Sequence, residues 1–287
     1  MKNFLTSPLR LFCFLTPVVL LMCCAGENYS GGYQSQNWID TTANTLNTRI
    51  RTPKGMERLN VPEKSFANYI TGLNVYPVDH PVHLFDGRIK SDQRHHVAVI
   101  KMDIPKKDLQ QCADACIRLR AEYLWASGKY DDIHFKLTNG FRMEYSKWRD
   151  GMRLVVKGNS TEWQKKKNTD HSYACFMTYL ETVFMYAGTI SLYPELKSIS
   201  PLDLLPGDVI IEAGSPGHAV MVADVATHND GTKKILLMQS YMPAQEIHVI
   251  NNPSEDNGNP WYDLPDGNAF KTADWTFKNY KVGRFAD

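Results

Sequence analysis

Three residues in the second half of the chain have the types and the order that thiol chemistry needs. Cys175 stands near the start of an apolar-periodic segment, His218 opens a β-type run, and Gln239 ends the next such run. A thiol attacks a carbonyl as its thiolate, which a helix N-terminus and a nearby imidazole both favour. The imidazole needs a polar group that fixes its tautomer and ring plane. We therefore predict Cys175 as nucleophile, His218 as general base and Gln239 as the orienting group.

Polar and aromatic residues near these three are candidates for binding a substrate. Tyr241 and Gln245 follow Gln239 closely, and Ser172 precedes Cys175. Ser172 is open to two interpretations, because its hydroxyl either takes part in the chemistry or caps the helix that begins there, and capping is the favoured one. We assign Ser172, Tyr241 and Gln245 to the predicted binding site.

The surrounding segments predict the elements that must position these residues. Apolar periodicity indicates one helix over 105–125 and another over 173–187. Asn139-Gly140 is a hairpin signal. Runs of β-type residues indicate strands over 209–212, 219–225 and 235–239. Mixed helices and strands, followed by a helix and antiparallel strands, predict an α+β fold.

The other cysteines and the histidines give little sign of a metal site. Cys112 and Cys116 fall on the apolar stripe of the helix expected over 105–125, and free cysteine is among the most buried residue types. We therefore interpret both as core residues. No CxxC pair and no HExxH motif is present, and the adjacent His95 and His96 would point opposite ways on a strand. We expect no metal ion and no cofactor.

The N-terminal residues 1–25 have the layout of an export signal. Lys2 and Arg10 bound a positively charged start, an apolar run follows, and small residues permit cleavage after Ala25. A second export route is lipidation at Cys24. Both routes predict an exported protein that is periplasmic or attached to the outer membrane.

Composition and charge set the expected domains and partners. Residues 26–52 are polar and predict a tether, and 53–287 predict a single α+β domain. The formal net charge is +1, which lacks the basic excess of a nucleic-acid binder. We expect a peptide or glycan of the cell envelope as partner, no nucleic acid, and membrane attachment only through an N-terminal lipid.

Three short stretches resemble the NlpC-type branch of the papain-like fold, a group of exported cell-wall peptidases. They are Ala187-Gly188, Pro206-Gly207-Asp208 and Gly217-His218. The resemblance implies a helix packed on an antiparallel sheet, here with an N-terminal α/β extension. It also implies a Cys/His hydrolase that cleaves amide bonds in cell-wall peptides. Aligning the Ala-Gly helix end places the family's cysteine on Phe176, and one residue is about 100° around a helix.

This offset from Cys175 leaves a second hypothesis open, in which a catalytically inactive papain-like domain binds an envelope ligand in a groove beside His218 and Gln239. A closer resemblance, over nearly the whole chain after the signal, is to an uncharacterised family of exported bacterial proteins with a domain of unknown function. It implies no settled activity. Its blocks are 108–115, 118–124, 184–189, 216–222 and 239–245.

Overall fold

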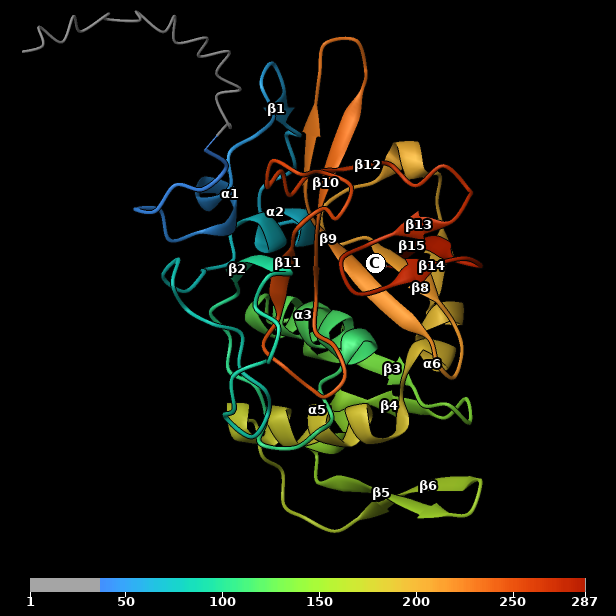
Figure 1. Ribbon diagram of the computed structural model, residues 1–287. Helices are drawn as coiled ribbons and strands as arrows, with labels where there is room; N and C mark the ends of the chain where they lie inside the picture. Colours follow the sequence, from blue (N-terminus) through green and yellow to red (C-terminus); the bar gives the residue numbers. More distant parts are fainter. Residues whose placement is uncertain (1–36, 287) are drawn as a thin grey trace, which may run out of the picture. The chain divides into compact units, whose positions relative to one another are not determined.

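The structure, a computed structural model, describes residues 37–286 (Figure 1). The predicted export signal, including Cys24, lies outside the described residues. Residues 37–52 belong to the stretch predicted as a tether, yet Leu46 and Ile50 are fully buried in the main apolar core. The packed domain therefore begins before the predicted boundary at residue 53.

Within residues 37–286 the chain forms six α-helices and two short 3-10 helices. They are α1 (Leu46–Arg49), α2 (Phe66–Thr71), α3 (Cys112–Ala126), η1 (Tyr130–Asp132), α4 (Tyr145–Arg149), α5 (Tyr173–Tyr186), α6 (Thr189–Glu195) and η2 (Pro201–Asp203). None of the helices among the described residues is long and apolar enough to span a membrane.

Nine strands of the described chain form one sheet, in which every pair of neighbours runs antiparallel. The sheet order is β2 (His96–Val99), β11 (His248–Ile250), β10 (Lys233–Gln239), β9 (His218–Thr227), β8 (Val209–Glu212), β15 (Lys281–Phe285) and β7 (Leu196–Ser198). In addition, β1 (Glu57–Arg58) pairs with β9, and β12 (Tyr262–Asp263) pairs with β10. Separate hairpins join β3 (His134–Lys136) to β4 (Arg142–Glu144), β5 (Met152–Lys157) to β6 (Ser160–Lys165), and β13 (Phe270–Lys271) to β14 (Thr276–Phe277).

This mixture of helices and a large antiparallel sheet confirms the predicted α+β class. Strand β9 lies near the middle of the sheet and is covered on both faces. Ala219 and Met221 belong to the apolar cluster that includes α3, whereas Val220 and Val222 belong to a second cluster on the other face. Because side chains alternate along a strand, a strand with two buried faces needs apolar residues at successive positions, as this sequence has.

Helices α2, α3 and α6 all contact strands of this sheet, and α3 is the one that lies against both β9 and β10. On its other side α3 meets α5, where Trp125 stacks on Phe176 with 5.7 Å between ring centroids. Figure 1 shows α3 lying between the sheet and α5. The segment with Cys175 is thus not the helix laid on the sheet. Helix α3 also starts later than expected, because the Asp114 carboxylate accepts the backbone N–H of Gln111 at 3.1 Å and so caps the helix there.

Candidate functional site

The first residue of β9 and the last residue of β10 form a hydrogen-bonded pair. His218 opens β9, and Gln239 ends the adjacent strand β10. His218 Nε2 lies 2.8 Å from Gln239 Oε1. Strand alternation puts both side chains on the face that also carries Val220. The pairing of two strands therefore brings together two of the residues that the sequence indicated.

Asp274 decides which way the Gln239 amide points. Gln239 Nε2 donates to Asp274 Oδ2 at 2.7 Å, and His95 Nδ1 lies 2.6 Å from Asp274 Oδ1. Burial raises the pKa of Asp274, but the His95 hydrogen bond and the charge of Lys90 outweigh it, so this pKa falls below its usual value. An ionised carboxylate only accepts hydrogen bonds, so the amide oxygen must face His218. His218 Nε2 therefore carries the proton, which leaves Nδ1 as a free proton acceptor.

Aromatic rings enclose the His218 imidazole. The ring centroids of Tyr241, Trp275 and Phe277 lie 5.2, 5.3 and 5.6 Å from it, and His218 has no exposed surface. Burial lowers the pKa of His218 to about 4, although the Gln239 hydrogen bond acts in the opposite direction. The ring is therefore neutral at pH 7. No residue of the described chain is a hydrogen-bond partner of its Nδ1, which is unusual for a buried polar atom.

The sulfur of a cysteine contacts β9 at Ala219, the residue after this histidine. Cys112 is the first residue of α3, and the backbone N–H of Ala219 donates to its sulfur. Burial raises the pKa of the Cys112 thiol to about 11, against the effect of that N–H. Tyr241 lies next to both groups: its ring packs on His218, and its pKa is raised by burial first, then by the charge of Asp274 and, once the thiol ionises, by that of Cys112. A neutral thiol and a neutral imidazole thus stand at the same end of β9.

A cavity of about 240 Å³ opens beside Cys112. Its walls come from the first turn of α3, the end of α5, the start of α6 and the loop before β9, and include Asp114, Ala187, Gly188, Thr189 and Gly217. Burial raises the pKa of the Asp114 carboxyl well above its usual value, and its Oδ1 has no partner within residues 37–286. Ala187, Gly188 and Gly217, which belong to two of the stretches that resemble the papain-like fold, therefore line the cavity beside Cys112.

A family model described as a domain of unknown function (4846) matches residues 46–284. The chain belongs to this family. No curated protein and no solved structure matches the chain. Family membership confirms the domain of unknown function, and it assigns no activity, so what the domain does must be argued from the geometry.

The structure separates Cys175 from the site around His218. Cys175 lies in the first turn of α5 and lines another cavity, together with Arg153 and Asp170. Burial and the charge of Asp170 raise the pKa of its thiol. The Ser172 hydroxyl accepts the backbone N–H of Cys175 at 3.1 Å, and Ser172 is therefore the N-cap of α5.

The other two residues assigned to substrate binding have different surroundings. Tyr241 packs on His218, as described above. Gln245 is buried, and its Nε2 donates to the backbone oxygen of Pro243 at 3.1 Å. Its side chain thus holds the turn after β10. Cys116, interpreted from the sequence as a core residue, is buried in the main core cluster.

Sequence reasoning passed over two residues of this site. Cys112 fits an apolar stripe as well as any core residue, and only its place as the first residue of α3 distinguishes it. A helix start assigned at Gln111, with Asp114 three residues later in a capping arrangement, is the signal that could have revealed it. Asp274 lies in the loop between β13 and β14, and no sequence pattern connects it to His218.

Proposed function

We propose that the protein is a thiol-dependent hydrolase of amide or ester bonds, with Cys112 as nucleophile, His218 as general base and Gln239 as the orienting group. One observation carries the proposal: His218 has one nitrogen fixed as a donor to Gln239 and the other unpartnered, one residue from the N–H that meets the Cys112 sulfur. The Cys/His class predicted from the sequence is kept, and the nucleophile moves from Cys175 to Cys112.

The reaction follows from the protonation states. Because the resting thiol and imidazole are both neutral, the thiol proton passes to His218 Nδ1 as the sulfur attacks the carbonyl carbon. Backbone N–H groups in the first turn of α3 lack intrahelical partners and favour the negative charge that develops on the carbonyl oxygen. His218 then protonates the leaving amine or alcohol. Water cleaves the resulting thioester, which frees the acid and restores the thiol.

Sulfur and imidazole must approach one another before this step. Within the described residues, no hydrogen bond joins Cys112 to His218, and catalytic contacts are often long until a substrate is bound. The aromatic shield of Tyr241, Trp275 and Phe277 excludes water from the His218–Gln239 hydrogen bond, which strengthens it. The ring plane is thereby held. Because α3 covers the Ala219 face of β9 and His218 lies on the Val220 face, the thiol of Cys112 reaches the imidazole only if the start of α3 or of β9 shifts when the substrate binds.

A peptide of the cell envelope is the substrate class that we propose, with the protein exported to the periplasm or the outer membrane. The cavity beside Cys112 has walls that suit a peptide: Asp114 Oδ1 has no partner within residues 37–286 and can hydrogen-bond to a peptide group, and the loop at Gly217 presents its backbone to the cavity. A Cβ at Gly217 would lie 2.5 Å from Thr189 Oγ1, so a side chain there would crowd the cavity wall.

A burst experiment with p-nitrophenyl acetate tests the proposal, because any acyl-accepting thiol can take its acetyl group. The full chain should release one equivalent of nitrophenolate and carry the acetyl group on Cys112, as read by mass spectrometry. The Cys175→Ala variant should keep the burst, Cys112→Ser should lose it, and His218→Gln should slow it by about 10²–10⁴-fold.

The pH profile distinguishes this pair from an ordinary thiol. With a base whose pKa is about 4 and a thiol whose pKa is about 11, the burst rate should be flat from about pH 5 to pH 8. An independent thiol reacts through its thiolate and gains about tenfold per pH unit. Acetylation of Cys175, or a rate that rises in this way, would refute the assignment.

Full burial of the imidazole favours a second candidate function, a domain without catalysis that binds an envelope ligand in the cavity beside Cys112. In that case the cavity at Cys112 is a binding groove. A well-folded chain that shows no burst, together with soluble cell-wall peptides that raise its melting temperature, would favour this function over hydrolysis.

A further inference from the structure

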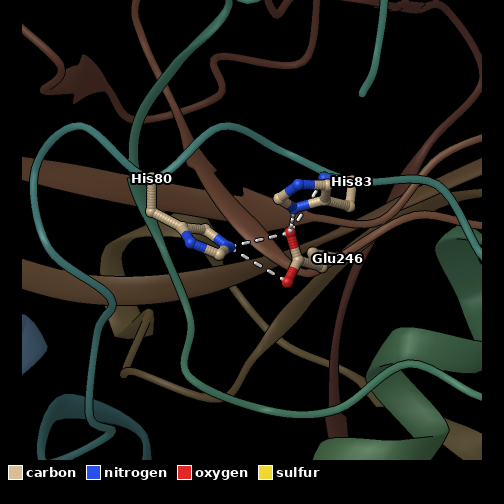
Figure 2. Close-up of side chains that lie close together, drawn as sticks. All are labelled: His80, His83 and Glu246. Carbon is tan, nitrogen blue, oxygen red and sulfur yellow. Dashed lines mark hydrogen bonds and ion pairs between the residues drawn. The ribbon is translucent and has the colours of Figure 1, made fainter. Parts of the chain in front are cut away.

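We propose a second site, unconnected with the thiol chemistry, that binds a divalent transition-metal ion of the zinc type through His80, His83 and Glu246. Each residue offers one ligand atom, and the three atoms lie within 4.8 Å of one another. Figure 2 shows both imidazoles turned towards the Glu246 carboxylate. Two imidazoles and a carboxylate are a donor set that zinc, nickel, iron and copper ions accept.

The distances match those around a bound ion. His80 Nε2 lies 3.2 Å from each Glu246 carboxylate oxygen, and His83 Nδ1 lies 3.0 Å from Oε2. Zinc holds nitrogen and oxygen at about 2.0–2.2 Å, so two ligands of a tetrahedral ion are about 3.4 Å apart. The two histidine–carboxylate distances therefore need to change by only a few tenths of an ångström, and the two imidazole nitrogens, which lie within 4.8 Å of one another, draw together by up to about 1.4 Å when both bind the ion.

Neighbouring groups hold the three side chains in place. The Tyr76 ring stacks on His80 with 3.9 Å between centroids and 13° between planes. The His83 backbone N–H donates to Glu246 Oε2 at 2.8 Å, and the Glu246 N–H donates to the His83 carbonyl at 2.9 Å. A site whose ligands are already oriented loses little side-chain freedom when an ion binds.

The site is open enough for an ion to enter. The side chains of His80 and His83 are 22% and 30% exposed, and Glu246 is 9% exposed. Three protein ligands leave a coordination position for water. On binding, the proton on the nitrogen that faces the carboxylate moves, by exchange with water, to the other nitrogen of the same imidazole, so each ring stays neutral and the ion takes the proton's place.

The ion would fasten two distant parts of the chain. His80 and Glu246 are 166 residues apart. The loop that follows the histidines crosses to the segment after β10, where Leu84 pairs with Gln245. The proposed ion would therefore hold this loop on the body of the domain, with hydrogen bonds between the histidines and Glu246 doing so in its absence.

The test uses the full chain stripped with EDTA and titrated with CoCl₂ and ZnCl₂. The chain should bind one Co²⁺ with a visible d–d absorption band, which Zn²⁺ abolishes, and Zn²⁺ should raise its melting temperature. His83→Ala and Glu246→Gln should each weaken Zn²⁺ binding by more than about 100-fold, since the loss of an outer-shell partner alone costs about 10–100-fold.

His228→Ala is the matched control, because His228 forms a comparable histidine–carboxylate contact with Asp230 at 3.0 Å on another part of the surface. It should leave Zn²⁺ affinity unchanged. If the unmodified chain binds no Co²⁺, or if His228→Ala weakens binding as much as His83→Ala, the proposal is overturned and the cluster is a metal-free hydrogen-bonded contact. His80→Ala repeats the test if either ligand variant fails to fold.

Discussion

The buried imidazole of His218 should make the folded protein sensitive to mild acid, and the variant that tests this is His218→Gln. Burial lowers the pKa of His218 to about 4, whereas an unfolded histidine keeps a pKa of 6.5. Below pH 6.5 the unfolded chain therefore binds a proton at this histidine, whereas the folded chain binds none until the pH approaches 4. The contribution of His218 to the free energy of unfolding is complete above pH 6.5 and is lost as the pH falls towards 4.

The magnitude follows from the same two values. The difference between a pKa of 6.5 and one of about 4 corresponds to about 3.5 kcal/mol, because one pKa unit is worth about 1.4 kcal/mol. At about pH 4.5, where the folded ring is still mostly neutral, the loss should be about 2.5 kcal/mol relative to about pH 7.5. Glutamine does not titrate in this range, so the variant should not show that loss.

Urea unfolding followed by tryptophan fluorescence measures this difference. The free energy of unfolding of the wild-type chain should fall between about pH 7.5 and about pH 4.5 by about 2.5 kcal/mol more than that of His218→Gln. Comparing the two chains cancels the contributions of all other titrating groups. His228→Gln, at a half-exposed histidine, should behave as wild type. Equal pH dependence in wild type and His218→Gln would show that the ring is hydrated in the folded state, and the reasoning about the site would fail.

Two further substitutions test the surroundings of the site. Asp274→Asn lets the Gln239 amide rotate, because asparagine can donate as well as accept hydrogen bonds. The p-nitrophenyl acetate burst should then slow by at least about tenfold, which is less than the loss of about 10²–10⁴-fold expected when a general base is removed. An unchanged rate in stopped-flow measurements would mean that Asp274 does not orient the amide. Ser172→Ala removes the cap of α5 and should lower the free energy of unfolding by about 1 kcal/mol in urea without changing the burst. A slower burst at unchanged stability would return Ser172 to the reaction.

Local sequence patterns predicted the elements that position the site. Strand β8 spans the predicted residues 209–212, and α5 covers 173–186 with Ser172 as its cap. The hairpin at Asn139-Gly140 joins β3 to β4, with Gly140 at a φ of +83°. Each of these elements depends on residues a few positions apart, where side-chain periodicity, caps and turn residues act directly on the backbone. The order of the strands then makes β9 and β10 neighbours, so the contact between His218 and Gln239 could be anticipated.

The choice of cysteine was decided only by tertiary packing. From the sequence, Cys175 lies near the start of one apolar-periodic helix and Cys112 well inside another, and nothing local states which of the two helices lies on the sheet. Tertiary packing lays α3 on β9 and places α5 on the side of α3 that faces away from the sheet. The sulfur of Cys112 therefore contacts the backbone of Ala219. Helix–sheet packing depends on how whole apolar faces fit together, a property that no short segment contains.

The amino-acid sequence by itself thus determined the α+β class, the strands that carry His218 and Gln239, and the cap of α5, because these depend on neighbouring residues. Only the tertiary structure brought Asp274 to the Gln239 amide and Glu246 to the two histidines at 80 and 83. Such contacts join residues 35 and more than 160 positions apart. Loops are placed by the elements they connect and by the surface beneath them, so their contacts leave no periodic pattern in the sequence.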